Sequence, residues 1–124
     1  MHTALLQAEQ QQHLDKQLAR QHQELVAQVA LSAPVGMERV VAALQAQQAA
    51  WLNYRREECE LVGSLTGAGG TWPSTHAIIC EVTLTEQRLG HVQRATQCIE
   101  RTRNEERTHG QSDCLQPLAS LVHR

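Results

Sequence analysis

Residues 51–59 read WLNYRREEC and place two aromatic residues, two arginines and a cysteine within about three turns of predicted helix. Helical neighbours lie three or four positions apart. Trp51, Arg55 and Cys59 therefore fall in one row, and Tyr54 lies beside that row. Such a row would ordinarily be plain hydrophobic core, so its arginine and its cysteine each need a structural reason.

The row belongs to a longer helix that we expect over about 37–62, after a first helix over about 3–31. Pro34 and Gly36 break the chain between the two helices. The apolar stripe of the first helix consists of Leu14, Leu18, Leu25 and Val29. The stripe of the second helix consists of Val40, Val41, Leu44, Gln48, Trp51, Arg55, Cys59 and Val62.

A glycine-rich loop is expected next, over 63–75, because GSLTGAGGTWPST holds four of the seven glycines. A third helix is expected over about 74–105, and Pro73 suits its first turn. One side of this helix carries Ile79, Val82, Leu89 and Val92, and the other carries Cys80, Leu84 and Arg88. The C-terminal segment 112–124 is expected to form a short amphipathic turn or helix through Leu115, Leu118 and Leu121.

These elements predict a single all-α domain, an antiparallel bundle of three main helices with a short C-terminal helix or turn. A chain of 124 residues can build one modest core. The sequence has no phenylalanine, so leucine, valine, alanine and isoleucine must fill that core. No apolar segment approaches the roughly 20 residues that span a bilayer, and no secretion signal is visible at the start.

The charge pattern argues against several classes of function. A net charge of −2 and a pI near 6.4 do not suit a nucleic-acid binder. The arginines of 94–107 alternate with glutamates, which is typical of a solvated helix end. The seven histidines are scattered and show no HxxxH spacing, and the cysteines show no CxxC spacing. No catalytic set of residues is recognisable. We therefore predict a non-enzyme without a metal or cofactor.

The four cysteines, Cys59, Cys80, Cys98 and Cys114, favour two disulfides and an oxidising compartment. Three pairings are possible, and sequential closure gives the shortest loops, each contributing about 3 kcal/mol. On the predicted layout Cys59 ends one helix and Cys80 begins the next. A bridge between them would clamp both mouths of the glycine-rich loop, which accounts for the cysteine in the opening row.

The arginine of the opening row has an equally structural interpretation. Arg55 can lay its aliphatic stem against Trp51 and reach a carboxylate or the carbonyls at a helix end. Glu58 and Glu86 are the candidate partners. On this hypothesis Arg55 ties two helices together.

The sequence LQAQQAAWLNYRREEC, followed by Gly-Gly-Thr and CEVTLTEQRL, resembles the N-terminal domain of the LprI-type lysozyme-inhibitor family over about residues 5–95. The pattern of that family runs Ala-Gln, Ala-Trp, aromatic-Arg and Cys, then Gly-Gly-Ser/Thr, then Cys, Leu-Thr and Arg. The positions that carry it are Ala46–Gln47, Ala50–Trp51, Tyr54–Arg55, Cys59, Gly69–Gly70–Thr71, Cys80, Leu84–Thr85 and Arg88.

The resemblance is thinner upstream. In the family pattern around Asp15, Ala19 and His22 replace an asparagine and a tyrosine. His13 stands where the family has a cysteine, so the family's N-terminal disulfide is absent. Cys98 and Cys114 look like its replacement at the other end of the chain.

The resemblance implies a small helical protein, periplasmic or exported and held by disulfides, in a family with members that inhibit lysozyme. A first hypothesis is therefore an inhibitor of lysozyme or a related peptidoglycan hydrolase, acting by cleft occlusion. The glycine-rich loop would supply the projection and its acidic root would steer a cationic partner. The structural alternatives are that Trp72 lids the bundle and that the glutamates form a solvated helix face. The candidate partner-binding residues are Trp72, Ser64, Thr66, Thr71, Glu57, Glu58 and Glu60.

Two other functions stay open at this point. One is an immunity protein that neutralises a single toxin delivered to the periplasm. The other is a non-inhibitory structural or adaptor protein, in which the apolar seam of the first helix pairs with another chain. The sequence leaves the oligomeric state open.

Overall fold

The computed structural model of the protein describes residues 2–32, 37–66, 72–104 and 110–119. Its elements are α1 (His2–Ser32), α2 (Met37–Thr66), α3 (Trp72–Asn104), α4 (Gly110–Leu115) and a 3₁₀ turn, η1 (Gln116–Ala119). The described residues contain no strand. The predicted all-α bundle with three long helices and a short C-terminal helix is confirmed.

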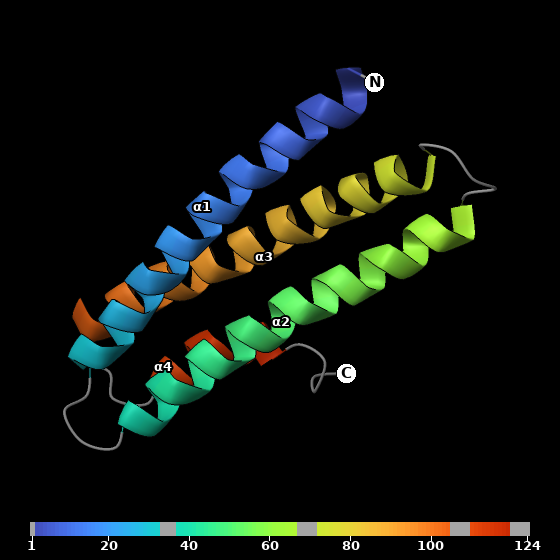
Figure 1. Ribbon diagram of the computed structural model, residues 1–124. Coiled ribbons are helices and arrows are strands. Elements are labelled where there is room, and N and C mark those ends of the chain that lie inside the picture. Colours follow the sequence, from blue (N-terminus) through green and yellow to red (C-terminus); the bar gives the residue numbers. More distant parts are fainter. Residues whose placement is uncertain (1, 33–36, 67–71, 105–109, 120–124) are drawn as a thin grey trace.

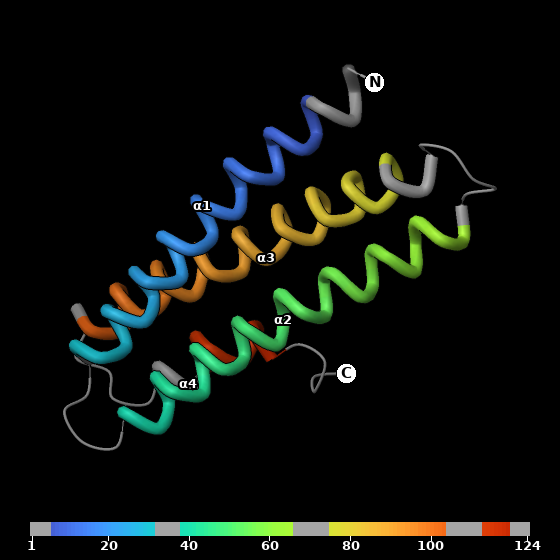
Figure 2. Tube along the Cα trace, viewed as in Figure 1, coloured from blue at the N-terminus to red at the C-terminus, as the bar shows by residue number. Residues whose placement is uncertain are grey.

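The three long helices run alternately up and down (Figures 1 and 2). Helix α3 packs against both α1 and α2, whereas α1 and α2 contact each other far less. The short α4 and η1 fold back onto α3, beside the first half of α2 (Figure 1). Helix α4 and η1 therefore add to the bundle at the end where α2 begins and not at the end where α2 stops and α3 starts.

The core lies where the apolar stripes of the helices meet. The α1 stripe is fully used inside the chain, since Leu18, Leu25 and Val29 are at most 1% exposed. An adaptor would have offered this seam to another chain, but here the chain's own α3 and α2 pack against it. The remaining buried apolar residues are Leu14, Leu44, Val82, Leu89, Val92, Ala95, Ile99 and Leu118.

One residue of the predicted α3 stripe points outward. Ile79 is 40% exposed, and the preceding Ile78 packs against the core instead. The sequence predicts Ile79 in the stripe because it lies three positions before Val82. Since the contact line of two packed helices drifts along their surfaces, the inward position near the start of α3 falls one residue earlier than the extension predicts.

Both predicted disulfides are present. The Cα atoms are 5.4 Å apart in Cys59–Cys80 and 5.5 Å apart in Cys98–Cys114. The first joins α2 to α3, and the second joins α3 to α4. The pairing by shortest loops is confirmed, and all four cysteines of the chain are bridged.

The position of the first bridge differs from the expectation. Helix α2 continues to Thr66 and α3 already begins at Trp72, so both helices extend into the predicted loop 63–75. The remainder, 67–71, lies outside the described residues. At 1.5 Å per residue, about 10 Å of helix separates Cys59 from the end of α2. The bridge therefore fastens two helix bodies rather than the mouths of a loop. Gly63 lies within α2 and is buried.

No described helix combines the length and the apolar character that crossing a bilayer would need.

Candidate functional site

The row of Trp51, Arg55 and Cys59 on α2 faces the interior at the middle of the bundle. Trp51 is half-buried, and two guanidinium groups lie close to its ring. The Cζ atoms of Arg55 and Arg88 are 5.5 Å and 5.6 Å from the ring centroid, within the range of cation–π attraction. Both arginines are nearly buried, at 9% and 4% exposure. Buried charges need partners, and the two arginines find different ones.

Arg55 joins all three long helices. Its Nη1 donates to Asp15 Oδ1 of α1 at 2.6 Å and to Thr85 Oγ1 of α3 at 2.8 Å. Its Nε lies 3.8 Å from Glu81 Oε1. Gln11 Nε2 adds a second hydrogen bond to Asp15 Oδ1, at 3.0 Å. This Arg55 network fixes the register of α1 against the α2–α3 pair.

The predicted partners of Arg55 were wrong. The ion pairs go to Asp15 and Glu81, and neither Glu58 nor Glu86 takes part. Glu86 is exposed, and Glu58 is a half-buried residue of α2 outside the row of Trp51, Arg55 and Cys59. Asp15 could have been found from its place in the resemblance. Nothing local in the sequence places α1 across from Arg55.

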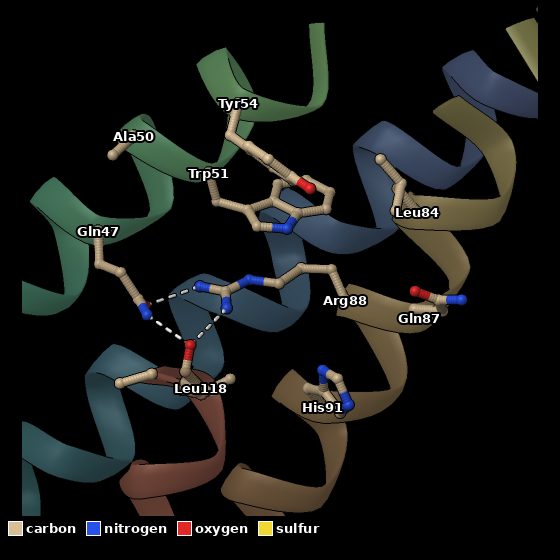
Figure 3. Close-up of a pocket in the computed structure, with 10 residues that line it drawn as sticks. Gln47, Ala50, Trp51, Tyr54, Leu84, Gln87, Arg88, His91 and Leu118 are labelled. Atoms are coloured by element: carbon tan, nitrogen blue, oxygen red, sulfur yellow. Dashed lines mark hydrogen bonds between the residues drawn. The ribbon is translucent and has the colours of Figure 1, made fainter. Parts of the chain in front are cut away.

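Arg88 has a different set of partners. Its Nε donates to Gln48 Oε1 at 3.0 Å. Its Nη2 donates to Gln47 Oε1 at 2.8 Å and its Nη1 to the Leu118 carbonyl at 3.3 Å (Figure 3). Gln47 Nε2 also donates to that carbonyl, at 2.6 Å. Burial lowers the pKa of Arg88 to about 10. The guanidinium thus bonds to neutral oxygens and holds η1 onto α2 and α3.

Two histidines lie near Arg88. The pKa of His22 is lowered, mainly by burial and then by the charge of Arg88, while a backbone hydrogen bond with Leu44 opposes the shift. The pKa of His91 is lowered by burial and by the charges of Arg94 and Arg88. Both imidazoles therefore favour the neutral form more than a free histidine does. Among the side chains described, His22 Nε2 is buried without a hydrogen-bond partner.

Two grooves flank these networks. A groove of about 490 Å³ lies between α2, α3 and η1, and Tyr54 and Leu84 form one end of its lining (Figure 3). Its other lining residues are Gln47, Ala50, Trp51, Gln87, Arg88, His91, Leu118 and Ala119. A second groove of about 740 Å³ lies between α1 and α2 over the Asp15–Arg55 pair. Within the described ranges, no three metal-ligating side chains lie close enough together to hold an ion.

The predicted partner-binding residues lie at the far end of α2 and beyond it. Glu57, Glu60 and Ser64 are exposed there, and Glu58 is half-buried. Thr66 is the last residue of α2 and Trp72 is the first of α3. The side chains of Thr66, Thr71 and Trp72 lie outside the part of the chain that the structure describes. The motif residues Trp51, Tyr54, Arg55 and Arg88 form a separate group, at the middle of the bundle.

Sequence reasoning missed two kinds of residue. Gln47, Gln48 and Thr85 serve as polar partners of the buried arginines; Gln47 and Thr85 belong to the family pattern and Gln48 to the α2 stripe, but none was predicted to bond to an arginine. Leu61 and Leu65 are 53% and 77% exposed, although leucines four positions apart on a helix ordinarily indicate a buried face.

Comparison with known proteins gives one match. The family model described as "Lysozyme inhibitor LprI" matches residues 2–91. No curated protein and no solved structure matches the chain. The matched range contains both partners of the Asp15–Arg55 pair and the Cys59–Cys80 bridge. It ends before the Cys98–Cys114 bridge and α4.

Proposed function

The chain belongs to the LprI lysozyme inhibitor family, and on that premise we propose that it inhibits a lysozyme or a related peptidoglycan hydrolase by occluding its substrate cleft. The match over residues 2–91 is the observation that carries this proposal. The protein acts as a stoichiometric binder and not as an enzyme. Its partner is therefore a protein.

The end of the bundle where α2 stops and α3 starts is the part that enters the cleft. Cys59–Cys80 and the Arg55 network hold α2 and α3 together behind that end. A rigid projection loses little conformational entropy on binding, so more of the contact energy appears as affinity. The residues that we propose to contact the enzyme are Glu57, Glu58, Glu60, Ser64, Thr66, Thr71 and Trp72.

The proposed location is the periplasm or the extracellular space. Two disulfides in a chain of 124 residues are typical of an oxidising compartment, where peptidoglycan hydrolases also act. The family membership supports the same location.

A titration tests the proposal. Several peptidoglycan hydrolases are assayed on cell-wall substrate with increasing protein, and we expect inhibition of at least one that saturates near equimolar ratio and weakens as substrate is raised. Trp72→Ala should weaken that inhibition, whereas Leu31→Ala at the opposite end of the bundle should not. Failure to inhibit any hydrolase would contradict the proposal. Inhibition restricted to one toxin delivered by a competitor would assign the same occlusion to an immunity protein.

A further inference from the structure

Among the described elements, α4 and η1 cover the α2–α3 surface only beside the first part of α2. At the end where α2 begins, η1 lies over it and is held through the Leu118 carbonyl by Gln47 and Arg88 (Figure 3). Beyond η1 the surface opens at the 490 Å³ groove, where Tyr54 is 45% exposed beside Leu84. From there toward the end of α2, the exposed fractions of Tyr54, Leu61 and Leu65, 45%, 53% and 77%, indicate that no described element covers this side of the helix.

An apolar row follows this uncovered surface along α2. Leu61 and Leu65 come seven and eleven positions after Tyr54, which places all three on one side of the helix. The row is about 16 Å long at 1.5 Å per residue. The exposed fractions of Leu61 and Leu65, 53% and 77%, are too large for residues that serve the core. We call these three residues the α2 row.

The surroundings of the α2 row are acidic. Residues 57–87 contain five glutamates and no lysine or arginine. Of these glutamates Glu81 lies near Arg55 and Glu57 pairs with the exposed Arg56, with 3.6 Å between Arg56 Nε and Glu57 Oε1, whereas Glu60 and Glu86 are exposed. The basic residues of α3 begin only with Arg88. An apolar strip bordered by carboxylates complements a protein surface that offers apolar side chains ringed by lysine and arginine.

We propose that the α2 row, Tyr54, Leu61 and Leu65, is the docking surface for a cationic protein, which is the hydrolase of the proposed function on which this inference rests. The partner places apolar side chains over Leu61 and Leu65, and a side chain in the groove beside Tyr54. The surrounding glutamates raise the association rate and contribute less to the lifetime of the complex. This helix face adds to the contact made by the end of the bundle that enters the cleft.

The experiment measures binding of a hydrolase that the wild-type protein inhibits, by biolayer interferometry, with the full chain and both disulfides formed. Leu61→Gln and Leu65→Gln should each raise the Kd at least about tenfold, and about a hundredfold together. Leu31→Gln is the matched control because Leu31 is equally exposed, at 71%, near the end of α1 at the opposite end of the bundle. It should leave the Kd unchanged. Thermal melts should be the same for all variants within about 2 °C, because none of the leucines is buried.

A second arm tests the charges. Glu60→Lys should lower the association rate several-fold at low salt and leave the dissociation rate nearly unchanged. Glu24→Lys, an exposed glutamate on α1, is the control and should alter neither rate. Raising the salt concentration from 0.05 to 0.5 M should remove the difference, since screening shortens the reach of surface charges to a few ångströms (from about 13 Å to about 4 Å).

The outcomes separate the two proposals. If the wild type inhibits a hydrolase and the Leu61→Gln/Leu65→Gln variant binds it equally well, the docking surface is wrong while the proposed function stands. If the wild type binds no hydrolase, both are wrong. If sedimentation shows a wild-type dimer that the double variant abolishes, the α2 row serves a second copy of the chain, and the assignment to a hydrolase is overturned.

Discussion

The replacement of Asp15 by alanine tests the energetic role of the Arg55 network. Asp15 Oδ1 accepts a 2.6 Å hydrogen bond from Arg55 Nη1, and only 11% of the Arg55 side chain is exposed. The substitution leaves a nearly buried guanidinium with Glu81 at 3.8 Å and the Thr85 hydroxyl at 2.8 Å. We expect the free energy of unfolding to fall, because the remaining groups compensate the charge only partly.

The magnitude follows from how far the pair is buried. Removing one partner of a fully buried pair costs about 3–5 kcal/mol, and an exposed pair contributes about 0–1 kcal/mol. The Asp15 side chain is 41% exposed, so water reaches part of the site after the substitution. An intermediate loss of about 2 kcal/mol results. For a chain of 124 residues this lowers the urea midpoint by about 1–2 M and the Tm by about 8 °C.

The assay is urea unfolding followed by circular dichroism, with both disulfides intact. Glu60→Ala is the control, since Glu60 is exposed on α2, and it should change the unfolding free energy by less than about 0.5 kcal/mol. In the double-mutant cycle, Arg55→Met should cost at least about 1 kcal/mol less in the Asp15→Ala background than in the wild type. A loss for Asp15→Ala no larger than that of the control, or a cycle without coupling, would refute this account of the network.

Three further predictions follow from the same structure. Cys59→Ala/Cys80→Ala should lower the unfolding free energy by about 3 kcal/mol in thermal melts and weaken hydrolase inhibition as well, and unchanged inhibition would show that the bridge does not shape the binding end. The lowered pKa of His22 means that the unfolded state binds more protons than the folded state below pH 6.5, so the stability falls as the pH drops through that value. In thermal melts from pH 7.5 to 5, His22→Gln should reduce this loss of stability. An unchanged dependence of the Tm on pH would contradict the prediction. Arg88→Met should release η1, so hydrogen exchange should speed up at Leu118 and its neighbours while the middle of α2 stays protected, and equal exchange in both proteins would argue against the bond to the Leu118 carbonyl.

The helices and the disulfides could be read from local patterns. Leucines at helical spacing predict α1, and cysteines 21 and 16 positions apart predict the two bridges, because short loops close most readily. The glycine-rich segment predicted a reversal of the chain, but not where the helices end. Glycine lowers helix propensity by only about 1 kcal/mol, and packing of Gly63 within α2 outweighs this.

The candidate site depended more on tertiary structure. The sequence marks Arg55 as misplaced in an apolar row and gives Arg88 only as a position of the family pattern, and the partners of these arginines include the carboxylate of Asp15 and the carbonyl of Leu118. These partners lie 40 positions before Arg55 and 30 positions after Arg88. Likewise, two leucines four positions apart indicate a core face, whereas Leu61 and Leu65 are surface residues because none of the described helices covers them.

The sequence alone therefore determined which segments are helical, which cysteines join, and that Arg55, one of the two motif arginines, must be accommodated inside the bundle. Periodicity and loop length carry this information because they depend on neighbours along the chain. The tertiary structure decided which oxygens those arginines meet and which apolar row is left uncovered. Both depend on the register and the covered length of packed helices, which are set by the sum of many weak contacts between distant segments.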